Sequence, residues 1–339
     1  MTPRSCDDIK AYVQRALASR PTDPGSVHSP SPYWGYFVEQ FAYLYDLSDA
    51  QLQRIRYHTY HLTGDNYQRY LFRNLNPAAI AARYRRLLPA LEGFLPSEPP
   101  GGFGYSVDGA LVTEDLIRYM EVLNDLLASG VFTRRAPPRV LEIGGGYGGL
   151  ARLLASVNPS LSYVVCDLEE TLFFQAVHLA NTYGMDAIRL VEAEDNVGAL
   201  MAPGRFVLVP QQRSDMLDGL RFDVAINQES LQEMTLEQVR HYLDLVSRTS
   251  THFYSYNLDQ HREYIIDETR IVTGLYTELN RFFPRKIWEA TYRKRRGDSI
   301  RSPLRRLAHL LLGRYARLVT RSAADGRPPN RVYRCVFEC

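Results

Sequence analysis

Cysteine is scarce in this chain, and none of its four cysteines, Cys6, Cys166, Cys335 and Cys339, belongs to a C-x-x-C pair or a metal-binding spacing. The sequence contains no run of eighteen apolar residues, so it predicts no membrane span. Its first residues lack the apolar core of a signal peptide. It also lacks a clear cluster of carboxylates, so we expect no metal ion. These absences predict a protein of the reducing cytoplasm.

Net charge is small, +2 at pH 7, but it is unevenly distributed. Residues 281–331 hold thirteen arginines and two lysines against three acidic residues. Within this stretch, residues 297–326 carry leucines at helical spacing between arginines, which predicts a basic amphipathic helix inserted before the last strand. Such a helix could bind an anionic partner, lie on a membrane surface, pair across a homodimer or pack on its own subunit with a solvated basic face. The sequence leaves these alternatives open.

The most informative stretch has five glycines within six residues, Gly144 to Gly149. It follows an apolar strand, and a second apolar strand about one βα unit later ends in Asp167. Glycine permits the positive φ angles of a tight strand-to-helix turn and lets a ligand approach the main chain closely. An acid at the end of the second strand can accept both hydroxyls of a ribose. The pattern therefore predicts a nucleoside site at the strand ends of a doubly wound sheet.

The rest of the chain supports this fold class. Strands alternate with helices after residue 130, which predicts an α/β protein with a Rossmann-like sheet of seven strands, the last one reversed. Residues 1–130 instead form a mostly helical N-terminal region, with helical spacing over 1–20, 36–60, 76–94 and about 113–129. The predicted strands are residues 139–143, 162–166, 205–210, 222–227, 251–256, 286–292 and 331–338. We predict a division into an N-terminal lid or acceptor region over 1–130 and a core over 131–339.

Two ligand classes fit the glycine motif. Gly144, Gly146 and Gly149 have the spacing of the dinucleotide fingerprint, so a nicotinamide or flavin site is one alternative. Glu142, two residues before the first glycine, argues against it, because a carboxylate is repelled by a pyrophosphate but attracted to a cationic amino-acid group. The motif also begins after about 135 residues of other sequence, whereas dinucleotide domains often open a chain.

The segment Glu142-Ile-Gly-Gly-Gly-Tyr-Gly148 resembles the E/D-x-G-x-G-x-G motif of class I S-adenosylmethionine-dependent methyltransferases. Stretches over residues 112–119, 140–151, 222–234 and 253–257 also resemble the sugar O-methyltransferases of antibiotic and surface-glycan gene clusters. The similarity covers roughly residues 100–260. It implies S-adenosyl-L-methionine as the cofactor, a methyltransferase core over 131–339, and methyl transfer to a hydroxyl of a sugar or glycosylated natural product.

The resemblance also implies which residues hold the cofactor. The glycine turn would bind its amino-acid portion, and Glu142 would organise that turn or face the ammonium group. Asp167 would hold the ribose, with Leu168 against the adenine. Arg118 would meet the cofactor carboxylate and Gln211 the adenine edge, a surface arginine and an exposed loop amide being the alternatives. The predicted cofactor-binding set is Glu142, Gly144, Gly145, Gly146, Tyr147, Asp167, Leu168, Gln211, Asn227 and Arg118.

A hydroxyl acceptor must lose its proton, so a general base is expected near the transferred methyl group. Glu229 and Glu233 follow the fourth strand, and in a helix they would share one face, where their repulsion would raise one pKa. His261 follows the fifth strand and has an ordinary pKa near neutrality. For each of these residues a cap, an ion pair or a surface position is the structural alternative. We expect the base to be one of the three.

Three other functions stay open at this point. The acceptor could be a non-sugar hydroxyl or an amine of a natural product, or the protein could bind the cofactor without catalysis. A nucleic-acid methyltransferase would fit the basic stretch, but Asn227-Gln-Glu-Ser230 departs from the N/D-P-P-Y/F motif of enzymes that methylate bases. We therefore expect a small-molecule acceptor and no nucleic acid. Twelve of the 23 tyrosines precede residue 120, and their faces can stack on sugar rings.

Overall fold

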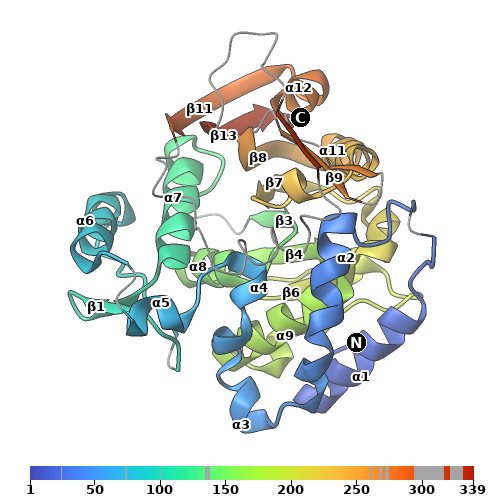
Figure 1. Cartoon of the computed structure of the whole chain (residues 1–339), viewed down its shortest axis with the longest axis horizontal. Helices are drawn as coiled ribbons and strands as arrows, with labels where there is room; N and C mark the ends of the chain where they lie inside the picture. Colours follow the sequence, from blue (N-terminus) through green and yellow to red (C-terminus); the bar gives the residue numbers. More distant parts are fainter. Residues whose placement is uncertain are drawn as a thin grey trace.

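The computed structural model describes the chain except for residues 24, 73–74, 100, 134–137, 260–261, 267–268, 272–274, 294–316 and 321–330. Its centre is an eight-stranded sheet (Figure 1). In sheet order the strands are β11 (Arg285–Arg293), β13 (Arg331–Glu338), β8 (Ser250–Asp259), β7 (Phe222–Gln228), β3 (Arg139–Ile143), β4 (Ser162–Asp167), β6 (Phe206–Pro210) and β5 (Ile188–Leu190). From β8 to β5 all neighbours are parallel, whereas β13 runs antiparallel to both β8 and β11.

This arrangement confirms the predicted Rossmann-like α/β fold. All seven predicted strands are present, and the last one is reversed. The eighth strand, β5, was missed because three residues are too few to show an alternating pattern.

The register of the central strands places the glycine turn beside the neighbouring strand ends. Ile143 pairs with Cys166 on β4, and Glu142 pairs with Ile226 on β7. The chain leaves β3 towards β4 on one side, and β7 flanks β3 on the other, so this is the point where the strand order reverses. Ligands of open α/β sheets bind outside the carboxyl ends of strands at such a point.

Alternate residues of the central strands enter two apolar layers, as the period of a strand requires. Val140 and Val165 belong to the cluster that α8 (Gly149–Val157) and α9 (Glu169–Tyr183) cover. Leu141 and Val164 belong to the opposite cluster, which α11 (Leu236–Thr249) and α12 (Leu275–Phe282) cover. Short segments complete the core: η4 (Met185–Ala187), α10 (Val197–Leu200), η5 (Gln211–Leu217) and η6 (Leu231–Glu233).

The N-terminal region packs against the first of these layers. Helix α1 (Cys6–Ala18) starts at Ser5, whose hydroxyl accepts a hydrogen bond from the Asp8 amide, and it packs on α9. At its centre the Tyr12 hydroxyl donates to the Val191 carbonyl at 2.7 Å. The helical segments that follow are α2 (Pro32–Val38), η1 (Glu39–Asp46), α3 (Asp49–Leu52), η2 (Ile55–His58), α4 (Tyr60–Thr63), α5 (Tyr67–Leu71), α6 (Pro77–Leu87), η3 (Leu88–Leu91) and α7 (Glu114–Ala128). A hairpin of β1 (Tyr105–Val107) and β2 (Ala110–Val112) precedes α7.

Three of the predicted N-terminal helices are confirmed by α1, α6 with η3, and α7. The helical spacing predicted over 36–60 corresponds to four short helical segments, α2, η1, α3 and η2, in succession. Leu47 is extended, and Ser48 with Gln51 forms a capping box that starts a new helix. The division at residue 130 stays a prediction, as does a homodimer.

The C-terminal part holds a second, small sheet of β10 (Thr269–Ile271), β9 (Arg262–Ile266) and β12 (Arg317–Thr320). Most of the predicted basic amphipathic helix, at 297–316 and 321–326, lies outside the described residues. Helix is the wrong prediction for 317–320, which pair with β9 as a strand; the β-branched Val319 and Thr320 favour that conformation. Among the residues that the structure describes, no helix is long and apolar enough to cross a membrane.

Candidate active site

A cavity of about 840 Å³ lies at the carboxyl ends of the parallel strands. One side, which we call the sheet wall, consists of Glu142, the turn 144–146, residues 166–168, 228–230 and 232–234, and neighbouring strand tips. The other side, the helical wall, consists of lining residues from 31–40, 60–64, 83–86 and 114–121. In Figure 1, α2, α4 and α7 lie around the ends of β3 and β4. The N-terminal helices therefore complete a site whose floor is the sheet.

The glycine turn is tight on one side and open on the other. Gly144 has φ +75° and donates its amide to the Cys166 carbonyl at 3.0 Å. A Cβ atom at Gly144 would lie 2.2 Å from Oγ of Ser230, so no larger residue fits there. Gly146 has φ +58°, and a Cβ atom there would meet nothing within 4 Å. Main chain at Gly146 is thus accessible from the cavity that it lines.

Asp167 is fixed against this turn. Its Oδ1 atom accepts the Leu168 amide at 2.8 Å, and its Oδ2 atom accepts Nε2 of Gln175 at 2.7 Å. The amides of Gly145 and Gly146 also donate to it. Burial raises the pKa of Asp167 to about 7, and these hydrogen bonds act in the opposite direction. The carboxylate that was predicted to hold a ribose therefore lies beside the glycine turn, in the cavity wall.

Gln175 of α9 is a site residue that sequence reasoning missed. Besides Asp167, its Nε2 atom bonds to the Gly146 carbonyl at 3.1 Å, so it joins the turn to the carboxylate. Its signal in the sequence is a polar amide among the apolar residues of this helix, and the structure shows that the amide is fully buried.

Glu142 lies in the sheet wall although its residue is only 2% exposed. It accepts a hydrogen bond from the Tyr163 hydroxyl at 2.9 Å. Burial raises its pKa to about 8; the Tyr163 hydroxyl lowers it, and the charge of Asp167 raises it further. Both carboxylates are held by neutral donors in the described structure, so a cationic ligand would stabilise their charged forms.

Two members of the predicted cofactor-binding set, Tyr147 and Asn227, are buried behind the cavity wall. Nδ2 of Asn227 donates to the Ile143 carbonyl at 2.8 Å, and its Oδ1 atom accepts Nδ2 of Asn257 at 2.9 Å. It thus ties the ends of β3, β7 and β8 together. This placement supports a positioning role for both residues rather than direct contact with a ligand.

Arg118, Leu168 and Gln211 line the cavity. The Arg118 side chain is 19% exposed and pairs with Asp115, so it is no free surface arginine. Nε2 of Gln211 donates to the carbonyls of Val27 and Ser29, at 3.2 and 2.8 Å. Gln211 is therefore no exposed loop amide, and it fastens the N-terminal loop to the end of β6.

Of the predicted bases, Glu229 and Glu233 line the cavity, whereas His261 lies outside the described residues. The two glutamates would share a face only in a helix, and the segment does not form one: Glu229 has φ +56°, and only 231–233 form a short 3-10 turn. The Glu229 amide donates to the Tyr256 carbonyl at 2.7 Å, which holds this turn at the end of β7. Its carboxylate lies 3.6 Å from the Arg118 guanidinium.

His61 is another residue in the cavity wall that no sequence pattern singles out. Its ring lies against Phe37 and Tyr60 in a region rich in aromatic residues. Burial lowers the pKa of His61, so its imidazole is neutral at pH 7 and able to accept a proton.

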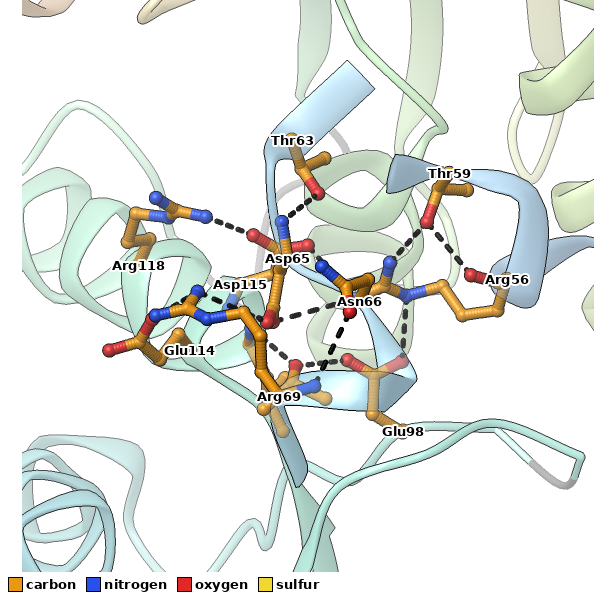
Figure 2. A network of polar contacts seen from close by, with 12 residues as sticks. Arg56, Thr59, Thr63, Asp65, Asn66, Arg69, Glu98, Glu114, Asp115 and Arg118 are labelled. Carbon is orange, nitrogen blue, oxygen red and sulfur yellow. Dashed lines mark hydrogen bonds and ion pairs between the residues drawn. The ribbon is translucent and has the colours of Figure 1, made fainter. Parts of the chain in front are cut away.

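The helical wall is supported by a buried ion-pair network, shown in Figure 2. Its centre is Arg56, whose side chain is 3% exposed. The Arg56 guanidinium lies 2.8 Å from Asp115, 3.5 Å from Glu98 and 4.0 Å from Asp65. Asp115 also pairs with Arg118, so the network reaches the cavity.

The same arginine connects the helical wall to the glycine turn. Its guanidinium lies over the rings of Tyr147, at 4.1 Å, and Phe103, at 4.7 Å. Arg69 extends the network outward, with its Nη1 atom 2.8 Å from Glu114 and 3.5 Å from Asp65. Tyr147 thus acts as the point of attachment between two parts of the chain that are far apart in sequence.

In the described part of the chain, no group of three or more His, Cys, Asp or Glu side chains is arranged to hold a metal ion.

No model of a protein family matches the sequence, and no curated protein matches it. Among solved structures, the N-terminal domain of EvdMO1 with S-adenosylhomocysteine bound is 15% identical at a TM-score of 0.39, over 78% of this chain and 97% of that one. The N-methyltransferase NodS from Bradyrhizobium japonicum WM9, with the same compound, is 13% identical at 0.39, over 76% and 97%. Magnesium protoporphyrin IX methyltransferase from Synechocystis PCC 6803, with S-adenosylmethionine bound, is 12% identical at 0.39, over 75% and 89%. Similarity at this level carries no functional inference, and the fold rests on the strand order described above.

Proposed function

We propose that the protein is an S-adenosylmethionine-dependent methyltransferase that methylates a hydroxyl of a sugar or glycosylated natural product. One observation carries this proposal: two carboxylates, the buried Glu142 and the partly buried Asp167, flank a positive-φ glycine turn at the switch point of the sheet and line one cavity. The motif resemblance at residues 142–148 supports the same class.

The residues present fit this cofactor. When bound, it supplies an electrophilic methyl group on a positively charged sulfur. Glu142 and Asp167 would favour a cationic ligand, since each lacks a cationic partner among the interactions of the described residues. Asp167 would also accept hydrogen bonds from ribose hydroxyls. The open side of Gly146 would bind the amino-acid portion of the cofactor.

Removal of the acceptor proton is assigned to Glu229. Its backbone adopts a left-handed conformation at the end of β7, which costs free energy and is typical of functional sites. Its carboxylate lies in the cavity wall, next to Arg118. Glu233 and His261 remain the predicted alternatives.

Aromatic residues of the helical wall support a sugar acceptor. Tyr33, Trp34, Tyr36 and Phe37 line the cavity from α2, and their rings lie against one another. Flat rings beside hydroxyl groups suit the apolar faces and polar edges of sugar rings.

The cofactor assignment is tested by calorimetric titration of the protein with S-adenosylmethionine, S-adenosylhomocysteine and NAD. We expect micromolar binding of the two adenosyl compounds and at least about a 100-fold loss in Asp167→Ala, because a charged hydrogen-bond acceptor is removed from a buried site. Asp186→Ala, an exposed carboxylate elsewhere, is the matched control. Binding of NAD alone, or of none of the three, would overturn the proposal.

The base assignment is tested separately, on the first acceptor that turns over. Glu229→Gln is expected to lower kcat by about 10² to 10⁴ while leaving S-adenosylhomocysteine affinity within about threefold. Glu233→Gln should have a smaller effect. Equal losses in both variants would contradict the assignment, and turnover of amines but not hydroxyls would overturn O-methylation.

A further inference from the structure

The cavity continues past α7 to a region that the cofactor assignment leaves unused. Figure 1 shows α6 on the outer side of α7, and Arg83 and Arg86 of α6 both line the cavity. Arg83 lies 3.3 Å from Glu121 of α7, and Glu121 in turn lies 3.4 Å from the hydroxyl of Tyr256 on β8. We call this part of the wall the outer end.

The outer end carries an excess of positive charge. Arg334 of β13 completes it, with its guanidinium 5.8 Å from the centre of the Tyr256 ring. Three arginines therefore line this end together with one carboxylate, Glu121. Asp125 lies 3.0 Å from Arg334 and compensates the charge of this second arginine. Asp125 itself does not line the cavity.

Arg86 is the one of these three arginines that neither Glu121 nor Asp125 compensates. It lies three residues after Arg83, so both project from one face of α6. Arg83 pairs with Glu121, whereas no ion pair of Arg86 occurs within the described part of the chain. Arg86 is exposed, so its guanidinium is accessible to a ligand that enters the cavity.

We propose that the outer end binds an anionic group of the acceptor, a phosphate or a carboxylate, through Arg86 with Arg83 beside it. The proposal rests on the proposed function, because it describes the second substrate of the same cavity. The cavity is then polarised: carboxylates at the glycine turn face the cationic cofactor, and arginines at the outer end face the anionic acceptor. A planar guanidinium forms paired hydrogen bonds with either anion, which fixes orientation as well as attraction.

The test uses the full chain saturated with S-adenosylhomocysteine, titrated calorimetrically with glucose, glucose 1-phosphate, UDP-glucose and glucuronate. We expect at least one anionic probe to bind at least about tenfold more tightly than glucose, as one charge-assisted contact would provide. Preference for the phosphorylated probes or for glucuronate distinguishes the two sources of negative charge.

The variant Arg86→Gln should remove at least about tenfold of the anionic probe's affinity and leave glucose unaffected. Arg85→Gln is the matched control, since Arg85 is the adjacent residue on α6, pairs with Asp108 and lies outside the cavity lining. Equal binding of all four probes, or equal losses in both variants, would overturn the proposal. In that case, retained S-adenosylhomocysteine binding would leave the methyltransferase assignment standing, whereas its absence would overturn both.

Discussion

The two walls of the cavity differ in whether a positively charged side chain compensates their carboxylates. In the network that supports the helical wall, the buried carboxylates Asp65, Glu98 and Asp115 all lie within 4.0 Å of one arginine, Arg56. In the sheet wall, Glu142 and Asp167 are held by a hydroxyl, an amide and main-chain groups. A charge compensated inside the protein contributes to structure, whereas one left uncompensated beside a cavity is available to a ligand. We therefore infer that the carboxylates paired with Arg56 stabilise the structure of the site, whereas Glu142 and Asp167 are available to bind a ligand.

Substitution of Arg56 should produce the largest effect on stability. Arg56→Met leaves three buried carboxylates without their shared cation, and we expect the free energy of unfolding to fall by about 3–5 kcal/mol. Urea denaturation followed by circular dichroism measures this. The exposed pair of Arg85 and Asp108 provides the control, because Arg85→Gln should cost about 1 kcal/mol or less. Similar losses in both variants would show that the network contributes little.

Substitution of Gly144 tests the sheet wall without changing any charge. Gly144→Ala forces a side chain into both a positive φ and a contact with Ser230, and we expect a loss of about 2–4 kcal/mol together with weaker S-adenosylhomocysteine binding. Gly109→Ala is the matched control, because Gly109 has φ +84° but open space around its Cβ position. It should lose only about 1 kcal/mol. Equal losses would assign the whole effect to backbone conformation.

Affinity for the cofactor should depend on pH, because the sheet-wall carboxylates hold protons near neutrality. The pKa values of about 7 for Asp167 and about 8 for Glu142 lie above the ordinary values, so a cationic ligand must displace protons at pH 7. We expect S-adenosylhomocysteine affinity to rise by at least about tenfold from pH 6 to pH 8. Calorimetry in buffers of different ionisation enthalpy would detect the released protons, and Glu142→Gln should flatten the profile. Affinity that is flat or falls with pH would contradict the comparison.

The same two pKa values give a stability effect of definite sign. Both are raised in the folded state, so the folded protein keeps protons that the unfolded chain loses above about pH 4. This contribution to stability is complete below about pH 4 and disappears as pH rises through 7 and 8. Glu142→Gln should therefore become more stable relative to the unchanged protein as pH increases across that window, which thermal unfolding at a series of pH values measures.

The smallest effect is expected where the N-terminal loop meets the sheet. Nε2 of both Gln211 and Gln238 donates to the Ser29 carbonyl, at 2.8 and 2.7 Å. Gln211→Ala should cost about 1 kcal/mol and expose the loop over 21–31 to protease. The double variant with Gln238→Ala should lose more than the two single losses combined, because the carbonyl then loses both donors. Additive losses would indicate that the two amides act independently.

The contrast between the walls also explains what the sequence predicts. The sheet wall follows from local patterns: glycines between an apolar strand and a helix, and an acid at the next strand end. Glu142, Gly144 and Asp167 therefore lie together, as expected from the pairing of β3 with β4. Asn227 and Tyr147 belong to the same patterns but are buried behind the wall, because a sequence pattern does not determine which way a side chain points.

The helical wall depends on contacts that no local pattern encodes. Arg56, Glu98 and Asp115 lie on three separate segments of the chain, and each alone has the pattern of an ordinary charged residue on a helix or in a loop. His61 is equally isolated in sequence. The segment at 36–60 is an intermediate case: its apolar spacing predicts helical structure, but that spacing does not show where one short helix ends and the next begins at the capping box of Ser48 and Gln51.

Strand β13 has a consequence for synthesis of the protein on the ribosome. It lies between β8 and β11 and forms hydrogen bonds with both, although β11 precedes it in the chain. Until residues 331–338 have been translated, β8 presents an unpaired edge and β11 has no neighbour in this sheet. An open edge of this kind invites pairing with another nascent chain. We therefore expect the nascent chain to be most prone to such pairing in the interval between translation of β8 and of β13.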